Sequence, residues 1–259
     1  MGIWLAVATL VVSGCSAPES VTAQAAVIGR AQLVEPAGSA PQVRYCEYFL
    51  EPQGAPQTNG DASNIRVVYY APDGLEGSKL AEKRINGVID ESGVLLSTRP
   101  QISQEDFRLG EVREVTRSET GWRMRYRADR KSRLTESTLP MDKLDVIDAG
   151  FDPYVRQHWQ QLKAGETVQF QFASPVHGRS IKLRARSIPC TRAESDLCLR
   201  VELAQAFLRW IAGGEIDLEY IAGADGKPGS ARLTRFVGVT NLLNNAGEPQ
   251  RLQLDYFYR

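Results

Sequence analysis

Cysteines are the first residues of this chain whose type and spacing suggest chemistry. Ser13 and Gly14 stand directly before Cys15, and the stretch from Ile3 to Val12 ahead of them is almost entirely apolar. A run of about ten apolar residues is too short to span a membrane, which takes roughly 20, but it suits the apolar core of a signal peptide. Small residues let the extended chain enter a peptidase cleft, and a thiol can accept a lipid. The pattern therefore predicts cleavage before Cys15 and lipidation of its thiol.

The order Val12-Ser13-Gly14-Cys15 resembles the lipobox of bacterial lipoproteins. The resemblance implies a signal peptide at 1–14 and attachment to a membrane by a lipid such as palmitate. The small and polar composition that follows predicts a flexible tether at 15–26, and the remainder, 27–259, is predicted to be a single β-rich domain. Ser16 resembles the signal for sorting to the outer membrane, facing the periplasm. Met1 and Gly2 carry no positive charge, which leaves open a start further upstream. The structural alternative is a buried N-terminal strand that ends in Gly14-Cys15.

Three cysteines remain for an oxidising compartment, in which disulfides persist. Cys190 and Cys198 flank a largely polar run between two strand-like stretches, so we predict a disulfide that closes a hairpin loop. Cys46, next to Tyr45 and Glu47, is expected to be a small buried apolar residue. No Cys-x-x-Cys spacing occurs, so a metal site built from these thiols is not expected.

Two histidines and three aspartates are the other candidates for chemistry. His158 and His177 lack the neighbouring carboxylates or thiolates of a zinc site, and the chain contains no Gly-x-Ser-x-Gly motif. Asp145, Asp148 and Asp152 precede or begin a predicted helix, where carboxylates satisfy free backbone N–H groups. Their spacing does not fit a calcium-binding loop. We therefore expect aspartates that cap the helix and form turns, no catalytic residue, no metal, no cofactor and a protein that is not an enzyme.

Basic residues are dense from Arg113 to Arg133. A cationic strand face could meet lipid headgroups, but acidic residues such as Glu114 and Glu136 are interspersed, which favours cross-strand ion pairs. Over the whole chain 31 Lys and Arg residues balance 31 Asp and Glu residues, which gives no electrostatic reason to bind nucleic acid. A nucleic-acid partner is therefore not expected.

The dominant pattern in the sequence is an alternation of apolar and polar residues with a period of two, and the elements it predicts must position the candidate residues. Apolar residues alternate with polar ones at Trp122–Arg127, Val168–Phe172, Ile181–Arg184, Ile216–Tyr220 and Leu252–Tyr258. Such alternation predicts antiparallel strands with one dry face. A helix is predicted from Asp152, as N-cap, to before Gly165, and a second over Leu203–Ala212. The fold class is mainly β (α+β): a curved antiparallel sheet or incomplete β-barrel with one or two helices packed on the concave side.

A curved sheet that does not close leaves a concave apolar space, the usual form of a ligand pocket. Six aromatic residues on the predicted strands and helices are expected to line it: Trp122, Tyr126, Trp159, Phe170, Phe172 and Trp210. The alternative is that these rings form an ordinary filled core.

The order Asp148-Ala149-Gly150-Phe151-Asp152, followed by Arg156, Trp159, Gly165-Glu166-Thr167, Phe170 and the later stretch from Phe236 to Asn241, resembles a group of uncharacterised proteobacterial secreted proteins and lipoproteins. More distantly, the architecture is similar to the half-barrel carriers of lipoprotein sorting, which hold acyl chains in a hydrophobic cavity. Address and architecture favour an envelope lipoprotein that binds or carries a lipid or other apolar ligand. The alternative is a structural or interaction module that docks an envelope protein, and a hydrolytic enzyme ranks third.

Overall fold

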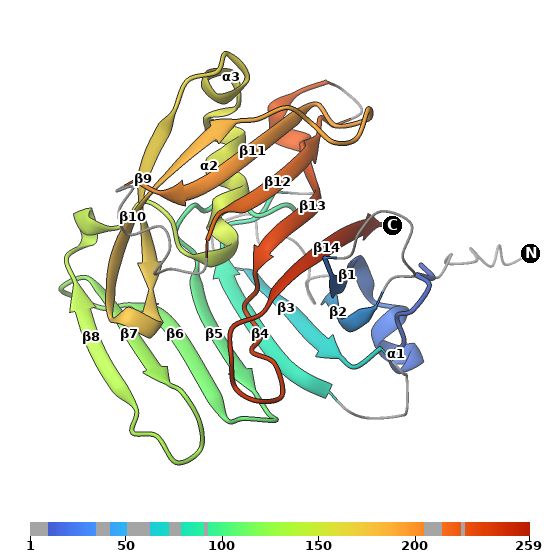
Figure 1. Cartoon of the computed structure of the whole chain (residues 1–259). Helices are drawn as coiled ribbons and strands as arrows, with labels where there is room; N and C mark the ends of the chain where they lie inside the picture. Colours follow the sequence, from blue (N-terminus) through green and yellow to red (C-terminus); the bar gives the residue numbers. More distant parts are fainter. Residues whose placement is uncertain are drawn as a thin grey trace, which may run out of the picture.

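Figure 1 shows a computed structural model that describes residues 10–34, 42–50, 63–72, 79–90, 93–204, 214–223 and 226–259. Within these ranges, fourteen antiparallel strands form one curved sheet that does not close. The predicted mainly β fold is therefore confirmed. The helix expected at Leu203–Ala212 lies outside the described residues apart from its first two positions, and so does Trp210.

The strands are joined as two meanders. The first contains β1 (Ala25–Leu33), β2 (Val43–Leu50), β3 (Ser63–Tyr70), β4 (Lys79–Gly87), β5 (Gln101–Asp106), β6 (Glu111–Arg117), β7 (Trp122–Arg127) and β8 (Thr135–Leu139). The second contains β9 (Val168–Ser174), β10 (Arg179–Ser187), β11 (Leu197–Leu203), β12 (Ile216–Ile221), β13 (Arg232–Val239) and β14 (Arg251–Tyr258). Because β14 pairs with β1, the meanders form one sheet whose edges are β8 and β9.

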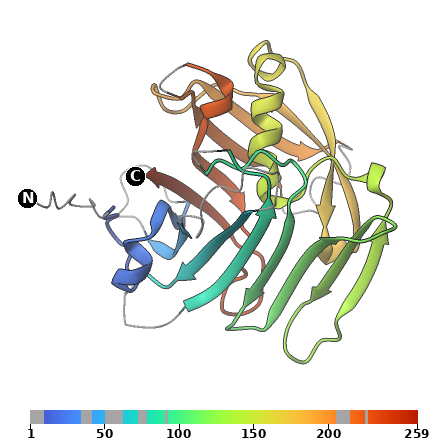
Figure 2. The same ribbon diagram turned by 180° about the vertical axis from the view of Figure 1, so that it is seen from behind.

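The connection from β8 to β9 contains four short helices. It runs through η1 (Met141–Lys143), η2 (Asp148–Gly150), α2 (Phe151–Gln157) and α3 (Trp159–Lys163). A single parallel bridge between Val146 and Phe172 holds this segment against β9, and the Asp145 carboxylate accepts a hydrogen bond from the Gln171 amide at 2.8 Å. The segment thus lies where the two sheet edges approach each other without pairing (Figure 2).

The predicted helix from Asp152 to Gly165 is two helices that meet at His158. Its N-cap is Gly150 and not Asp152, so the capping role predicted for Asp152 is wrong. The Asp152 carboxylate instead accepts a hydrogen bond from the Tyr220 hydroxyl at 2.7 Å. Apolar residues of α2 and α3 pack on the concave face of β9 to β12, where the core contains Tyr154, Val155, Trp159, Leu162, Phe170, Leu199, Leu218 and Tyr220.

The convex face of β1 to β3 is covered by the N-terminal segment. Val12 is buried there with Ile28, Cys46, Tyr48 and Val68, and Cys15, Ala17 and Val21 pack against the same cluster. This segment includes the short helix α1 (Glu19–Thr22), and β1 begins at Ala25. The residues predicted as a tether therefore contact the sheet in this structure.

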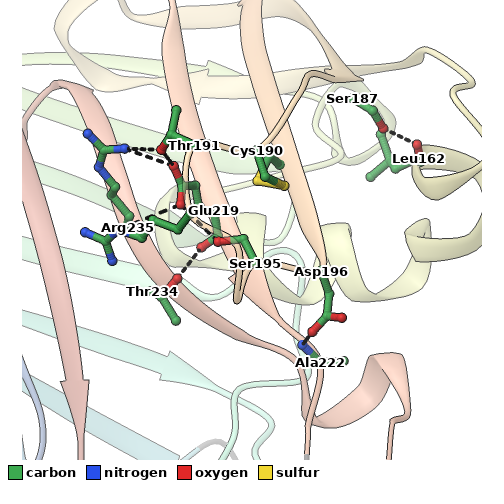
Figure 3. The surroundings of a disulfide bond; sticks show 12 residues. Leu162, Ser187, Cys190, Thr191, Ser195, Asp196, Glu219, Ala222, Thr234 and Arg235 are labelled. Atoms are coloured by element: carbon green, nitrogen blue, oxygen red, sulfur yellow. Dashed lines mark hydrogen bonds and ion pairs between the residues drawn. A yellow bond between two sulfur atoms is a disulfide. The ribbon is translucent and has the colours of Figure 1, made fainter.

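All four cysteines are paired. Cys190 and Cys198 form the disulfide predicted from the sequence, which joins the loop after β10 to the start of β11 (Figure 3). Beside it, the Glu219 carboxylate accepts hydrogen bonds from Ser195 at 3.0 Å and from Arg235 at 2.9 Å. Cys46 is fully buried as expected, but its sulfur is bonded to that of Cys15. A sulfur in a disulfide cannot also carry a lipid, so this bond and lipidation of Cys15 are mutually exclusive.

Candidate functional site

A cavity of about 730 Å³ lies inside the curve of the sheet. Its walls come from both meanders and from α2, and most of the lining is apolar: Phe49, Ile65, Val67, Phe151, Phe170, Phe172, Leu183, Val201, Ile216, Leu218, Phe236 and Leu254. Small-molecule sites in proteins are typically apolar cavities of roughly 300–1,000 Å³ that contain a few polar groups. The cavity has the size and the lining of such a site.

Two of the six aromatic residues expected at the cavity line it, namely Phe170 and Phe172 on β9. Trp159 on α3 is buried behind the wall, where its ring meets Tyr220 edge-on with 6.3 Å between the ring centroids. Trp122 and Tyr126 lie on β7 and do not line the cavity. Trp210 lies outside the described residues.

The loop between β13 and β14 packs inside the curve of the sheet, so a filled core and not the cavity lies on the side of β7. This loop packs on the concave face of β5, where the Gln104 side chain donates to the Asn241 carbonyl at 3.3 Å. The Arg108 guanidinium donates to the Leu243 carbonyl at 2.9 Å, and Leu242 is fully buried in the same core cluster as Trp122. A filled core therefore occupies this half of the sheet, and the cavity lies next to it.

Polar residues line one part of the cavity. Lys83 on β4 is only 4% exposed, and its ammonium donates to both carboxylate oxygens of Asp148, at 2.7 and 3.0 Å. Asp148 has a positive φ of 45°, and its Oδ1 also accepts a hydrogen bond from the Ala149 amide at 2.8 Å. Asp148 thus satisfies a backbone amide in the turn, as expected, and in addition forms a largely buried ion pair between η2 and the sheet.

Asp152 and Arg156 of α2 also line the cavity. Burial raises the pKa of Asp152, while the Arg156 charge and the hydrogen bond from Tyr220 oppose that rise. The Arg156 guanidinium donates to the Leu95 carbonyl at 2.6 Å, which ties α2 to the segment after β4. Helix α2 thus presents an acid from its first turn, Asp152, and a cation from its last turn, Arg156, to the cavity.

Glu47 is a further buried acid in the lining of the cavity. It lies on β2, is 5% exposed, and forms no ion pair within the part of the chain that the structure describes. Burial raises its pKa to about 7, although the Lys83 charge and a hydrogen bond with Tyr256 act in the opposite direction. The carboxyl group can therefore gain or lose a proton near neutral pH.

Gly29 of β1 makes room for the Glu47 side chain. Its register partners are Glu47 on β2 and Tyr256 on β14. A Cβ at Gly29 would lie 2.6 Å from Cγ and 2.7 Å from Oε1 of Glu47, and 3.0 Å from Cε1 of Tyr256. The two side chains thus converge above a glycine because any larger residue there would collide with them.

Sequence reasoning missed Glu47, Lys83 and Tyr256. The available signal was a charged residue on the dry face of an alternating strand, since Glu47 falls between Tyr45 and Phe49. Lys83 likewise falls between two apolar residues of β4 on the same face. A charged group at such a position is buried at a cost unless it is paired or has a function.

The remaining candidates do not form a site. Among the described residues, no group of three or more His, Cys, Asp or Glu side chains could hold a metal ion. His158 contacts the Tyr154 carbonyl and His177 contacts the Ser174 hydroxyl, so each is engaged locally. In the basic run, Arg125 pairs across strands with Glu114 at 2.8 Å, as the ion-pair interpretation predicted.

Comparison of the chain with protein-family models, with curated proteins and with solved structures found no match. Within the described ranges, no helix has the length and hydropathy of a membrane-spanning segment. A function for the cavity must therefore be argued from its own geometry.

Proposed function

We propose that this chain is an extracytoplasmic lipoprotein that binds a small lipid or other largely apolar molecule inside its curved sheet. The observation that carries the proposal is the cavity of about 730 Å³ and its mainly apolar lining. Transfer of apolar surface from water into such a space stabilises a complex by about 25 cal/mol per Å², or roughly 0.8 kcal/mol per buried CH₂ group. An alkyl chain of moderate length gains several kcal/mol in this way.

The proposed location is the cell envelope, with a lipid anchor on Cys15 at the outer membrane, facing the periplasm. The lipobox-like pattern before Cys15 supports the anchor. The disulfide between Cys190 and Cys198 is compatible with an oxidising compartment, because such bonds are rare in the cytosol. In the anchored form the sulfur of Cys46 would remain a free thiol, shielded by its complete burial.

Native mass spectrometry of the full chain, purified under mild conditions, tests the binding function. Leu183 lines the cavity from β10, whereas its neighbour Lys182 is exposed on the opposite face of the same strand. We expect a co-purified small molecule in the wild type and in Lys182→Trp, and its loss in Leu183→Trp, because only the second tryptophan fills the cavity. An unliganded mass for the wild type, with no uptake of a fluorescent fatty acid, would overturn the proposal.

A second candidate function is an interaction module that docks an envelope protein. The observation in its favour is β8, an edge strand whose residues are mostly exposed and which pairs only with β7 in the sheet. An exposed edge can accept a further strand from a partner. Retention of such a partner by Leu183→Trp, together with an empty cavity in the wild type, would favour this function.

A further inference from the structure

Glu47 stands inside a group of aromatic rings. Tyr45 and Phe49 lie two residues before and after it on β2, so all three side chains project from the same face, and all line the cavity. Tyr69 is the register partner of Glu47 on β3, and Tyr256 reaches it from β14 across Gly29. The Glu47 carboxyl group therefore has an aromatic neighbour in each direction along the sheet.

These four rings form two contacting pairs. Tyr45 and Tyr69 meet edge-on with 5.9 Å between centroids, and Phe49 meets Tyr256 in the same way at 6.2 Å. Aromatic faces attract cations through the ring quadrupole, most strongly where the cation is desolvated, and cages of such rings recognise ammonium groups. A carboxylate at the centre adds a charge-assisted hydrogen-bond acceptor.

Lys83 and Arg156, two cations that also line the cavity, have other partners. Lys83 donates to both oxygens of Asp148, and Arg156 donates to the Leu95 carbonyl while its charge acts on Asp152. Lys83 still lowers the pKa of Glu47 and Asp148 raises it, so these two opposite charges partly cancel at Glu47.

Two further arginines line the cavity and are exposed. Arg232 lies over the ring of Tyr258 at 5.0 Å from its centroid. Arg259 donates to the carbonyls of Thr22 and Ala23, at 3.1 and 3.0 Å. Neither forms an ion pair with Glu47, and among the described residues the Glu47 carboxyl group has no direct counterion.

We propose that Glu47 and the surrounding rings of Tyr45, Phe49, Tyr69 and Tyr256 bind a primary ammonium group, so that the ligand of the cavity is an amphipathic alkylamine. The inference deepens the proposed function and rests on it. The ammonium supplies the missing counterion, and the apolar lining around Phe170 and Leu218 takes the alkyl part. The ammonium binds the carboxylate form of Glu47. At lower pH, where the buried acid is protonated, binding of the ligand is therefore coupled to release of that proton.

Three probes with the same alkyl chain test this assignment: decylamine, decanol and decanoate, each measured by displacement of an apolar fluorescent dye from the full chain. At about pH 8, above the pKa of about 7 for Glu47, we expect decylamine to bind at least about tenfold more tightly than decanol, a difference of about 1.4 kcal/mol. The preference should shrink at about pH 5.5, where Glu47 holds its proton.

Glu47→Gln keeps the shape of the side chain and removes its charge. We expect the variant to bind decanol as the wild type does and to lose the preference for decylamine. Glu105→Gln is the matched control, because Glu105 is exposed on β5 and does not line the cavity. If Glu47→Gln does not fold, the pH dependence of the wild-type preference decides the question by itself.

The outcomes separate the two proposals. Equal affinity for decylamine and decanol, or tighter binding of decanoate, would overturn the ammonium site while leaving a cavity that binds apolar molecules. Tighter decanoate binding that is lost in Lys83→Met would place a carboxylate at Lys83 instead. Failure of all three probes to bind would overturn the proposed binding function itself.

Discussion

The side chains of Glu47 and Tyr256 approach each other across a third strand that lies between their own strands. Glu47 is on β2, Tyr256 is on β14, and β1 runs between these two strands. The two side chains can approach each other because the intervening residue in register is Gly29, which places no side chain in their path. The arrangement of Glu47 and Tyr256 in the cavity therefore depends on a glycine, which has no side chain.

Substitution of Gly29 should disturb this contact. A Cβ at this position would lie 2.6 Å from Glu47 Cγ, so Gly29→Ala forces both neighbouring side chains to move. We expect a loss of about 1–3 kcal/mol in the free energy of unfolding, the usual cost of overpacking, measured by chemical denaturation. Gly229→Ala is the control, since no atom lies within 4 Å of a Cβ at that position. Equal stability of the two variants would argue against the close approach.

Stability should depend on pH through Glu47. Its pKa is raised from 4.5 to about 7, so between these values the folded chain holds a proton that the unfolded chain releases. This contribution is fully present below pH 4.5 and is lost as the pH rises through about 7. Relative to Glu47→Gln, the wild type should lose up to about 3 kcal/mol of unfolding free energy over this range, at about 1.4 kcal/mol per pKa unit. Denaturation curves at several pH values measure it, and parallel pH profiles for the two proteins would contradict it.

Removal of one partner from the pair of Lys83 and Asp148 should be costly. The side chains are 5% and 18% exposed, so Lys83→Met leaves a largely buried carboxylate without its counterion. We expect a loss of about 3–5 kcal/mol in the free energy of unfolding. The double variant Lys83→Met with Asp148→Asn should recover most of this loss, because asparagine is neutral and tolerates the positive φ of 45° at this position. No recovery in the double variant would show that the ion pair is not the cause.

The state of Cys15 can be read directly from the mature protein. The proposed lipid anchor predicts that labelled palmitate enters the wild type and Cys190→Ala but not Cys15→Ala. The disulfide between Cys15 and Cys46 excludes lipidation of the same sulfur. Recovery of a linked peptide containing both cysteines from unreduced mature protein would therefore refute the anchor.

The sequence alone determined the class of fold, because alternation is a property of neighbouring residues. Val168, Phe170 and Phe172 form one dry face whichever strand they pair with, and the same holds for Leu252 and Leu254. The disulfide between Cys190 and Cys198 was predictable for a similar reason, since the two cysteines flank one short loop.

Only the tertiary structure decided which inward-facing residues form the cavity. The pairing of β14 with β1 joins the two ends of the domain and brings Tyr256 close to Glu47. The ion pair between Lys83 and Asp148 joins β4 to a segment far away in the sequence. The loop after β13 packs on the concave face of β5, and its Leu242 is buried in the same core cluster as Trp122, which is therefore a core residue and not a ligand contact. Such contacts depend on the register and order of strands far apart in the chain, and a local pattern contains no information about either.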